Sequence, residues 1–314
     1  MCIDLEQIGF PPFHQVLSRL SIADLYPKKI RCGIYILKFE TDELYVGQAL
    51  DVVRRFAQHK KTHIDITGIS FKGVAKSLLN TSERYIIEFL DYNEIPLRNI
   101  TFVSVVQGES DLDLLLTEEE QKRFISGLST KDSSSRVSDA DLRRRYQAKF
   151  LRLQKQDVYL DFLDVVKIYA RQCLPSPKKT ELSFWSVSCL PSGSQEPKIL
   201  SRVNLNMQEV LTAFCDISGL AFTFHVARSP LEQAFGAIWR ETLEASGAEV
   251  LEHRYAPGGQ DQIAVCCDKR QALRLLEVPA FLNSARCLNL RLMRKGPTKY
   301  NRYHCFALAD VLLE

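Results

Sequence analysis

The sequence lacks any long apolar run and any basic-then-apolar N-terminus. Among its 314 residues, no uninterrupted hydrophobic segment approaches the ~20 residues that are needed to cross a bilayer. The N-terminal MCIDLEQIGF is acidic early, which argues against a signal peptide. We therefore expect a cytoplasmic protein that has no membrane partner.

The nine cysteines lack the spacing of a metal site. No CxxC occurs, and the adjacent Cys266 and Cys267 lie in an apolar stretch (QIAVCC) where neighbouring strand residues point to opposite faces. An odd count without an export signal predicts reduced thiols that serve as small core side chains.

Charge of one sign is not in large excess, because the formal net charge is +3. Its distribution is uneven: residues 107–120 hold six acids and no base, residues 121–155 hold ten Lys/Arg against three acids, and residues 269–302 hold nine against one. The two basic segments are compatible with a phosphate backbone, although basic surfaces are common without one. Their candidate DNA contacts are Arg143, Arg144, Arg145, Arg286, Arg291, Arg294, Lys295, Lys299 and Arg302.

A β pattern begins at residue 33 and sets the organisation of the first third of the chain. GIYILKF is typical of a strand buried on both faces, ETDE of a turn, and LYVG of a second strand, which together predict a hairpin. Asp51 is placed to cap a helix over VVRRFAQHKK, and GISFKGVA predicts a third strand. A second helix is expected to begin at Thr81-Ser82 and to end before Pro96, with a last edge strand over residues 97–106. The predicted order is β-β-α-β-α, preceded by a short helical lead-in over residues 1–30.

The fold class predicted for the chain is α+β. A small three-stranded antiparallel sheet flanked by helices is expected in residues 1–105, with its core at 31–103. A polar linker with a long helix over about 139–173, opened by a Ser138–Asp141 capping box, is expected in residues 106–178, and a second α+β domain in 179–314. In that domain we predict strands at 181–190, 198–205, 220–227, 249–256, 261–267, 287–293 and 302–309, helices at 207–215, 229–247 and 269–277, and a hairpin at APGGQ.

The first domain contains the residue types that phosphodiester cleavage requires. That chemistry needs a group to activate water, positive charge for the transition state, and a carboxylate to hold a cation. Tyr35 and Tyr45 lie on the two strands of the hairpin, and Arg55 and His59 are four residues apart on one helix face. Glu83 is expected in the first turn of the next helix, where the helix dipole favours a carboxylate. Taken singly, each has an ordinary structural reading as a core tyrosine, a surface arginine or a helix-terminal acid.

The register of these residues distinguishes them. The chain holds two tripeptides, Gly33-Ile34-Tyr35 and Tyr45-Val46-Gly47, which are separated by nine residues. This pair resembles the paired tripeptides of the GIY-YIG nuclease superfamily. An arginine follows ten positions after the second tyrosine, then a histidine, a glutamate that begins a Tyr-Ile helix (SERYII), and Asn99-Ile100. The resemblance covers residues 31–103.

The resemblance implies a role for each residue that matches the motif. It implies that Tyr35 is the general base toward the attacking water, and that Tyr45 contacts the scissile phosphate or orients the water. It implies that Arg55 stabilises the developing charge and that His59 assists proton transfer or binds the phosphate. Glu83 would be the protein ligand of one Mg²⁺ (or Mn²⁺) per site, which suits a cation that keeps most of its waters.

Some neighbouring residues depart from the family pattern or have other readings. Gln48 stands where the DNA-repair branch often has lysine, and His63 is a second histidine that could replace or assist His59. Glu88 is expected to be solvated. Gln48, Arg54 and Lys60 are further candidate DNA contacts, although Arg54 is also typical of a solvated helix face.

The leading hypothesis is a DNA endonuclease whose second domain chooses the target, as in homing-type and some restriction enzymes. The second hypothesis is a structure-specific repair or recombination nuclease. A third is a non-catalytic nucleic-acid-binding or toxin-like protein, which the intact set of motif residues disfavours. One site would nick DNA, so cutting of both strands requires a homodimer or two successive events.

Overall fold

The β-branched segment that begins at Gly33 forms an inner strand of a four-stranded antiparallel sheet. The computed structural model describes residues 5–93, 95–99, 103, 110–128, 132–191, 197–252 and 255–314. The strands of this sheet, in spatial order, are β1 (His14–Gln15), β4 (Ile66–Gly73), β2 (Gly33–Phe39) and β3 (Leu44–Ala49). All of β2 except Lys38 is buried, as expected of a strand that is covered on both faces.

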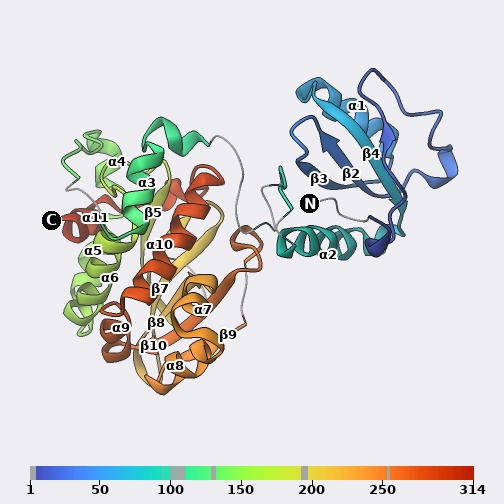
Figure 1. Ribbon diagram of the computed structural model, residues 1–314. Coiled ribbons are helices and arrows are strands. Elements are labelled where there is room, and N and C mark those ends of the chain that lie inside the picture. The colour runs from blue at the N-terminus through green and yellow to red at the C-terminus, as the bar shows by residue number, and fades with distance from the viewer. Residues whose placement is uncertain are drawn as a thin grey trace. The chain divides into compact units, whose positions relative to one another are not determined.

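One helix packs on each face of this sheet. Helix α1 (Val52–Thr62) buries Val52 and Phe56 in the same cluster as Tyr35 and Leu37, whereas α2 (Leu79–Tyr92) packs against the other face of β2. The Asp51 side chain caps α1 by accepting hydrogen bonds from the backbone N–H groups of Val53 (3.0 Å) and Arg54 (3.1 Å). The order β2-β3-α1-β4-α2 confirms the predicted β-β-α-β-α unit, and Figure 1 shows these elements together.

The N-terminal lead-in differs from the predicted helix. It contains the 3-10 turns η1 (Leu5–Ile8) and η2 (Lys28–Ile30), and between them β1 adds a fourth strand to the sheet by pairing with β4. Pro11 and Pro12 precede β1, and proline disfavours a continuous helix there. Of the expected edge strand over 97–106, Leu97 forms a bridge with Leu44, and most of the rest lies outside the described residues.

Contacts divide the chain at residue 107 into two compact units, 1–107 and 108–314. The segment expected to be a linker therefore belongs to the second unit, because Leu112, Phe150 and Phe162 are buried in its core. This segment holds the turn η4 (Asp111–Leu114) and the helices α3 (Glu118–Ile125), α4 (Ala140–Arg144), α5 (Gln147–Gln154) and α6 (Tyr159–Cys173).

The expected single helix over 139–173 is thus wrong and is replaced by α4, α5 and α6. The first break is at Tyr146, whose φ of 61° is left-handed and cannot continue a right-handed helix. Asp139, rather than Ser138, caps α4 by accepting from the backbone N–H groups of Asp141 and Leu142.

The second unit is built on a six-stranded antiparallel sheet with the order β5-β6-β7-β8-β10-β9. Its strands are β5 (Trp185–Cys189), β6 (Lys198–Leu205), β7 (Gln208–Asp216), β8 (Gly219–Ala227), β9 (Glu249–Leu251) and β10 (Gln262–Asp268). Its later helices are α7 (Ser229–Phe235), α8 (Trp239–Ala245), α9 (Lys269–Leu275), α10 (Pro279–Arg294) and α11 (Phe306–Leu313), with short 3-10 turns η5 (Gly236–Ile238), η6 (Ala256–Gly258) and η7 (Asn301–Tyr303).

Three secondary-structure predictions in this unit are wrong. Residues 207–215 form strand β7 instead of a helix, because they pair with both β6 and β8. Residues 287–293 lie inside α10, whose buried Phe281, Ala285, Leu288 and Leu292 repeat with helical spacing. Residues 302–309 form η7 and α11 instead of a strand. The expected strand over 249–256 is shortened to β9, and APGGQ lies in the connection between the antiparallel strands β9 and β10.

The two faces of this sheet differ in their surroundings. Val187, Val203, Leu211 and Phe224 are cross-strand neighbours that share one core with α6 and α10. Residues one position away on these strands point to the opposite face of the sheet. There Arg202 is the cross-strand neighbour of Ser188 and Thr212, and both Arg202 and Thr212 are half-exposed. Among the described residues, the helices therefore cover one face, and polar side chains line part of the other.

Two further expectations concern cysteines and membranes. In the part of the chain that the structure describes, eight cysteines are free and half of them are buried. The described helices include none with the length and apolarity that a bilayer crossing requires.

Candidate active site

The hairpin places Tyr35 directly opposite Gly47. The Tyr35 ring lies so close over the Gly47 backbone that a Cβ there would lie 2.3 Å from the hydroxyl oxygen. Tyr35 is only 1% exposed, so glycine at position 47 makes room for a large buried ring. This explains physically why the second tripeptide ends in glycine.

Helix α1 brings Arg55 and His59 to the Tyr35 hydroxyl. Arg55 Nε donates to this hydroxyl at 3.2 Å, and His59 Nε2 lies 2.7 Å from it. Because the hydroxyl accepts from Arg55, its own proton is free to be donated to a neutral His59. The three groups therefore form a relay, in which Arg55 donates to the Tyr35 hydroxyl and this hydroxyl donates to His59 Nε2.

Burial keeps the last two members of this relay neutral. It raises the pKa of Tyr35 well above its usual value, an effect that nearby Tyr45 adds to and the Arg55 hydrogen bond opposes. It also lowers the pKa of His59 to about 4, helped by the positive charge of Arg55 and by His63. Near neutral pH Tyr35 therefore stays protonated and His59 stays neutral, and the His59 tautomer with its hydrogen on Nδ1 leaves Nε2 as the acceptor of the Tyr35 hydroxyl.

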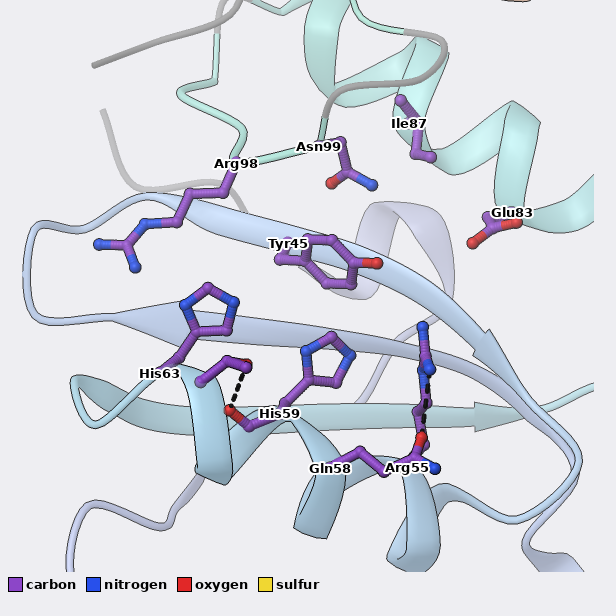
Figure 2. A pocket seen from close by; sticks show the side chains of 10 residues that line it. Tyr45, Arg55, Gln58, His59, His63, Glu83, Ile87, Arg98 and Asn99 are labelled. Atoms are coloured by element: carbon purple, nitrogen blue, oxygen red, sulfur yellow. Dashed lines mark hydrogen bonds between the residues drawn. The ribbon is translucent and has the colours of Figure 1, made fainter. Parts of the chain in front are cut away.

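A pocket of about 840 Å³ lies beside this relay and is lined by Tyr45, Arg55, His59 and Glu83 among others. Figure 2 shows Arg55 and His59 rising from α1 toward Tyr45, and Glu83 reaching in from α2 on the other side. The Tyr45 ring centroid lies 5.0 Å from that of His59 and 6.3 Å from that of Tyr35. The structure thus brings together the five residues that the sequence singled out.

Glu83 is held by Gln48 from the neighbouring strand. The Gln48 backbone N–H donates to one carboxylate oxygen (3.1 Å), and its side-chain amide donates to the other (2.9 Å). Burial raises the pKa of Glu83, and these hydrogen bonds oppose the shift. Helix α2 begins at Leu79, earlier than expected, because it continues directly from the 3-10 turn η3 (Lys76–Leu78), so Glu83 lies in the second turn.

The pocket suits a divalent cation with few protein ligands. The described residues contain no cluster of three or more His, Cys, Asp or Glu side chains with metal-site geometry. A half-buried carboxylate whose protein partner is a neutral amide fits Mg²⁺, which needs one or two carboxylates and keeps several waters. Glu83 is therefore the residue that would hold the cation.

Sequence reasoning missed one charged residue of the pocket, Arg98. Arg98 donates to Glu43 and Asp65, both at 2.7 Å, and its guanidinium lies 3.7 Å from the centre of the Phe39 ring. It belongs to an irregular segment after α2, where no periodicity marks it. Its neighbour Asn99 makes two hydrogen bonds to the backbone of Val46 (2.7 and 2.8 Å) and so fixes this segment against β3.

The sequence also singles out His63, which could replace or assist His59, and Glu88, which is expected to be solvated. His63 does line the pocket, with its ring 6.1 Å from that of His59. Glu88 pairs with Arg84 at 2.7 Å, outside the pocket lining.

The residues predicted to contact DNA are found in different surroundings. Arg54, Arg144 and Arg145 are exposed, whereas Lys60 donates to the carbonyls of Leu17 and Ile66. The remaining candidates in the second unit are mostly engaged within the fold: Arg143 pairs with Asp310, Arg291 with Asp261 and Arg294 with Asp113, and Arg286 donates to Gln172.

Lys295, another predicted DNA contact, lies in a buried environment. It is 7% exposed and donates to the carbonyl of Pro257, so its ammonium group is unsuited to a DNA surface. It follows the last residue of α10 as the C-cap, next to the buried inner face of that helix.

One family model matches the first unit. The family model of the GIY-YIG catalytic domain matches residues 31–94, which confirms the resemblance for the first unit. Searches of the curated proteins and of the solved structures gave no significant match.

Proposed function

We propose, from the GIY-YIG catalytic domain at residues 31–94, that this nuclease-superfamily member is a Mg²⁺-dependent DNA endonuclease whose second unit selects the target. The observation that supports this most directly is the contact between Tyr35, His59 and Arg55 at the edge of the pocket that Glu83 lines. A decayed site would be expected to lose at least one of these groups. The proposed reaction is hydrolysis of a phosphodiester bond.

In the proposed mechanism Tyr35 and His59 move one proton. The attacking water gives its proton to the Tyr35 oxygen while the Tyr35 proton passes to His59 Nε2 across the 2.7 Å hydrogen bond. The net transfer is from water to His59, so Tyr35 need not exist as a free phenolate. The oxygen of the water forms the new bond to phosphorus, and the leaving oxygen of the DNA takes a proton from solvent.

Arg55 and Tyr45 act on the charge that develops at the phosphate. Both line the pocket, and the Arg55 guanidinium has further N–H donors besides the one used on Tyr35. Glu83 would hold the divalent cation, which when bound supplies positive charge beside the scissile phosphate.

The test is cleavage of supercoiled plasmid with Mg²⁺ by the wild type, Glu83→Ala and Arg55→Ala. Each substitution is expected to lower the rate by about 10²-fold or more, as when a transition-state contact is removed. Lys61→Ala, at an exposed position of α1, and Glu88→Ala, on α2, are matched controls on the same helices and should cut like the wild type. Unchanged cutting by Glu83→Ala, or a wild type that cuts no DNA, would contradict the proposal.

A structure-specific repair or recombination nuclease is the second candidate. It is favoured by a tyrosine-rimmed pocket in the second unit, which is described below. Discrete plasmid fragments support sequence recognition, whereas cutting confined to flaps or junctions supports the second candidate.

A further inference from the structure

The two basic segments of the sequence meet in the second unit. The Tyr146 hydroxyl, from residues 121–155, donates to the carbonyl of Arg302, from residues 269–302, at 3.1 Å. A pocket of about 430 Å³ lies at this junction, between the start of α5, strands β5 to β7, and η7. Its volume is within the range of small-molecule sites, ~300–1,000 Å³.

Three tyrosines from two distant segments line this pocket: Tyr146, Tyr300 and Tyr303. Tyr303 is 42% exposed, and Tyr146 and Tyr300 are half-buried. Tyr146 has a left-handed backbone (φ 61°), which is uncommon for an aromatic residue. Amphipathic rings at a pocket mouth are suited to stacking against a flat ligand.

The sheet supplies the polar part of the pocket through Ser188, Arg202, Asn204 and Glu209. Arg202 Nε lies 3.5 Å from a Glu209 oxygen, beyond a tight ion pair, so donors and acceptors lie side by side. A bare anion would be repelled by Glu209. The edge of a nucleobase carries both donors and acceptors, and carboxylates and guanidinium groups pair with such edges.

Cationic side chains lie next to two of these tyrosines. Lys149 lines the pocket, and its ammonium lies 5.6 Å from the centre of the Tyr146 ring. Arg302 is exposed, with its guanidinium 4.6 Å from the Tyr303 ring centre. The exposed Arg144 and Arg145 precede Tyr146 directly. These cations suit the phosphates that flank a base.

We propose that this pocket binds an unpaired nucleotide of DNA, with the base among the tyrosines and its edge on Arg202 and Glu209. The proposal rests on the proposed function only in taking DNA as the ligand. Stacking on tyrosine requires a base that has left the duplex, so fully paired DNA should bind less tightly. The second unit would then direct cleavage to bulges, flaps or single strands.

The test is binding by the full chain carrying Glu83→Ala, which is expected to slow cleavage by about 10²-fold or more. Fluorescence anisotropy compares a labelled duplex with the same duplex holding an unpaired nucleotide, and 2-aminopurine at the unpaired position reports stacking. We expect the unpaired nucleotide to tighten binding by about tenfold and the 2-aminopurine emission to be quenched.

Substitutions show whether the preference for an unpaired nucleotide comes from the pocket or from the positive charge of the protein in general. Tyr303→Ala and Arg202→Ala should each remove most of this preference, whereas Tyr303→Phe keeps the ring and should retain it. Tyr92→Ala, an exposed tyrosine of the first unit, and Arg123→Gln, an exposed cation on α3, are the controls and should leave it unchanged. Thermal unfolding of each variant checks that its fold is intact.

Equal affinity for paired and unpaired DNA would overturn the proposal, as would a preference that survives both pocket substitutions. Equally tight binding of a free deoxynucleoside monophosphate would assign the pocket to a soluble nucleotide and also overturn it. Because cleavage is not the readout, a wild type that binds unpaired DNA but never cuts would refute the proposed function and leave this inference standing.

Discussion

The close packing of Tyr35 over Gly47 leads to a prediction about Gly47→Ala. The added Cβ would lie 2.3 Å from the Tyr35 hydroxyl oxygen and 2.4 Å from the ring carbon that bears it, whereas real Cβ contacts essentially never fall below 3.0 Å. The hydroxyl must therefore move by about 0.7 Å, the difference between 3.0 and 2.3 Å. If that shift runs along the 2.7 Å bond to His59, the bond lengthens to about 3.4 Å, beyond ordinary hydrogen-bonding range.

The expected result is a folded protein with an impaired relay. Overpacking a buried site costs about 1–3 kcal/mol of the free energy of unfolding, which urea titration measures. A misplacement of this size is expected to lower plasmid cleavage by about 10²-fold. Tyr35→Phe should lose activity similarly without the steric clash, since it removes only the hydroxyl.

Gly73→Ala is the matched control. A Cβ at Gly73, on strand β4 on the other side of β2, would meet only the Cys32 carbonyl at 3.9 Å, an ordinary contact. This variant should cut like the wild type. If Gly47→Ala cut at the wild-type rate, the position of the Tyr35 hydroxyl would be irrelevant to catalysis and the reasoning would be refuted.

Further predictions concern pH dependence and stability. Gln48→Ala removes the side-chain hydrogen bond that opposes the rise in the pKa of Glu83 and keeps the backbone one, so the acid limb of the rate–pH profile should move to higher pH; an unmoved limb would argue against Glu83 as the titrating group. Because the pKa of His59 falls from 6.5 to about 4 on folding, the unfolded state binds more protons between these values, and stability should decrease as pH falls through that window. His59→Gln should flatten this slope in urea titrations, and an unchanged slope would contradict the assignment. Arg136→Met leaves Glu181, with 1% of its side chain exposed, without its bidentate partner, and should destabilise the second unit by roughly 3–5 kcal/mol; a loss below 1 kcal/mol in urea unfolding would show that the pair is dispensable.

The first unit was largely predictable because its signals are local. The hairpin follows from a β-branched run and an acidic turn, and Asp51 marks the start of α1 by its own side-chain hydrogen bonds. Strand β1 was not predictable, because its two residues are a strand only through pairing with β4. Arg98 was missed for a similar reason, since its place in the pocket depends on Asn99 anchoring the chain to Val46.

The second unit was less predictable because short apolar segments fit more than one period. The alternation in residues 287–293 favours a strand when the segment is taken alone. Its helical spacing emerges only when the segment is extended back to Pro279, the first residue of α10. Nothing in the sequence marks the helix break at Tyr146, because this residue is neither glycine nor proline. Its side chain instead makes a contact that is distant in sequence, the hydrogen bond to the Arg302 carbonyl.

The pKa shifts of Tyr35 and His59 indicate how hydrolysis would be confined to bound substrate. Burial favours the neutral form of both groups, so in the free protein the proton remains on Tyr35. A phosphodiester in the adjacent pocket brings a negative charge close to His59, which favours its protonated form and therefore the transfer from Tyr35. Arg55 donates to the Tyr35 hydroxyl and so stabilises negative charge on that oxygen during the transfer. In the proposed mechanism, the burial that keeps Tyr35 protonated in the free protein would thus make proton transfer depend on bound DNA.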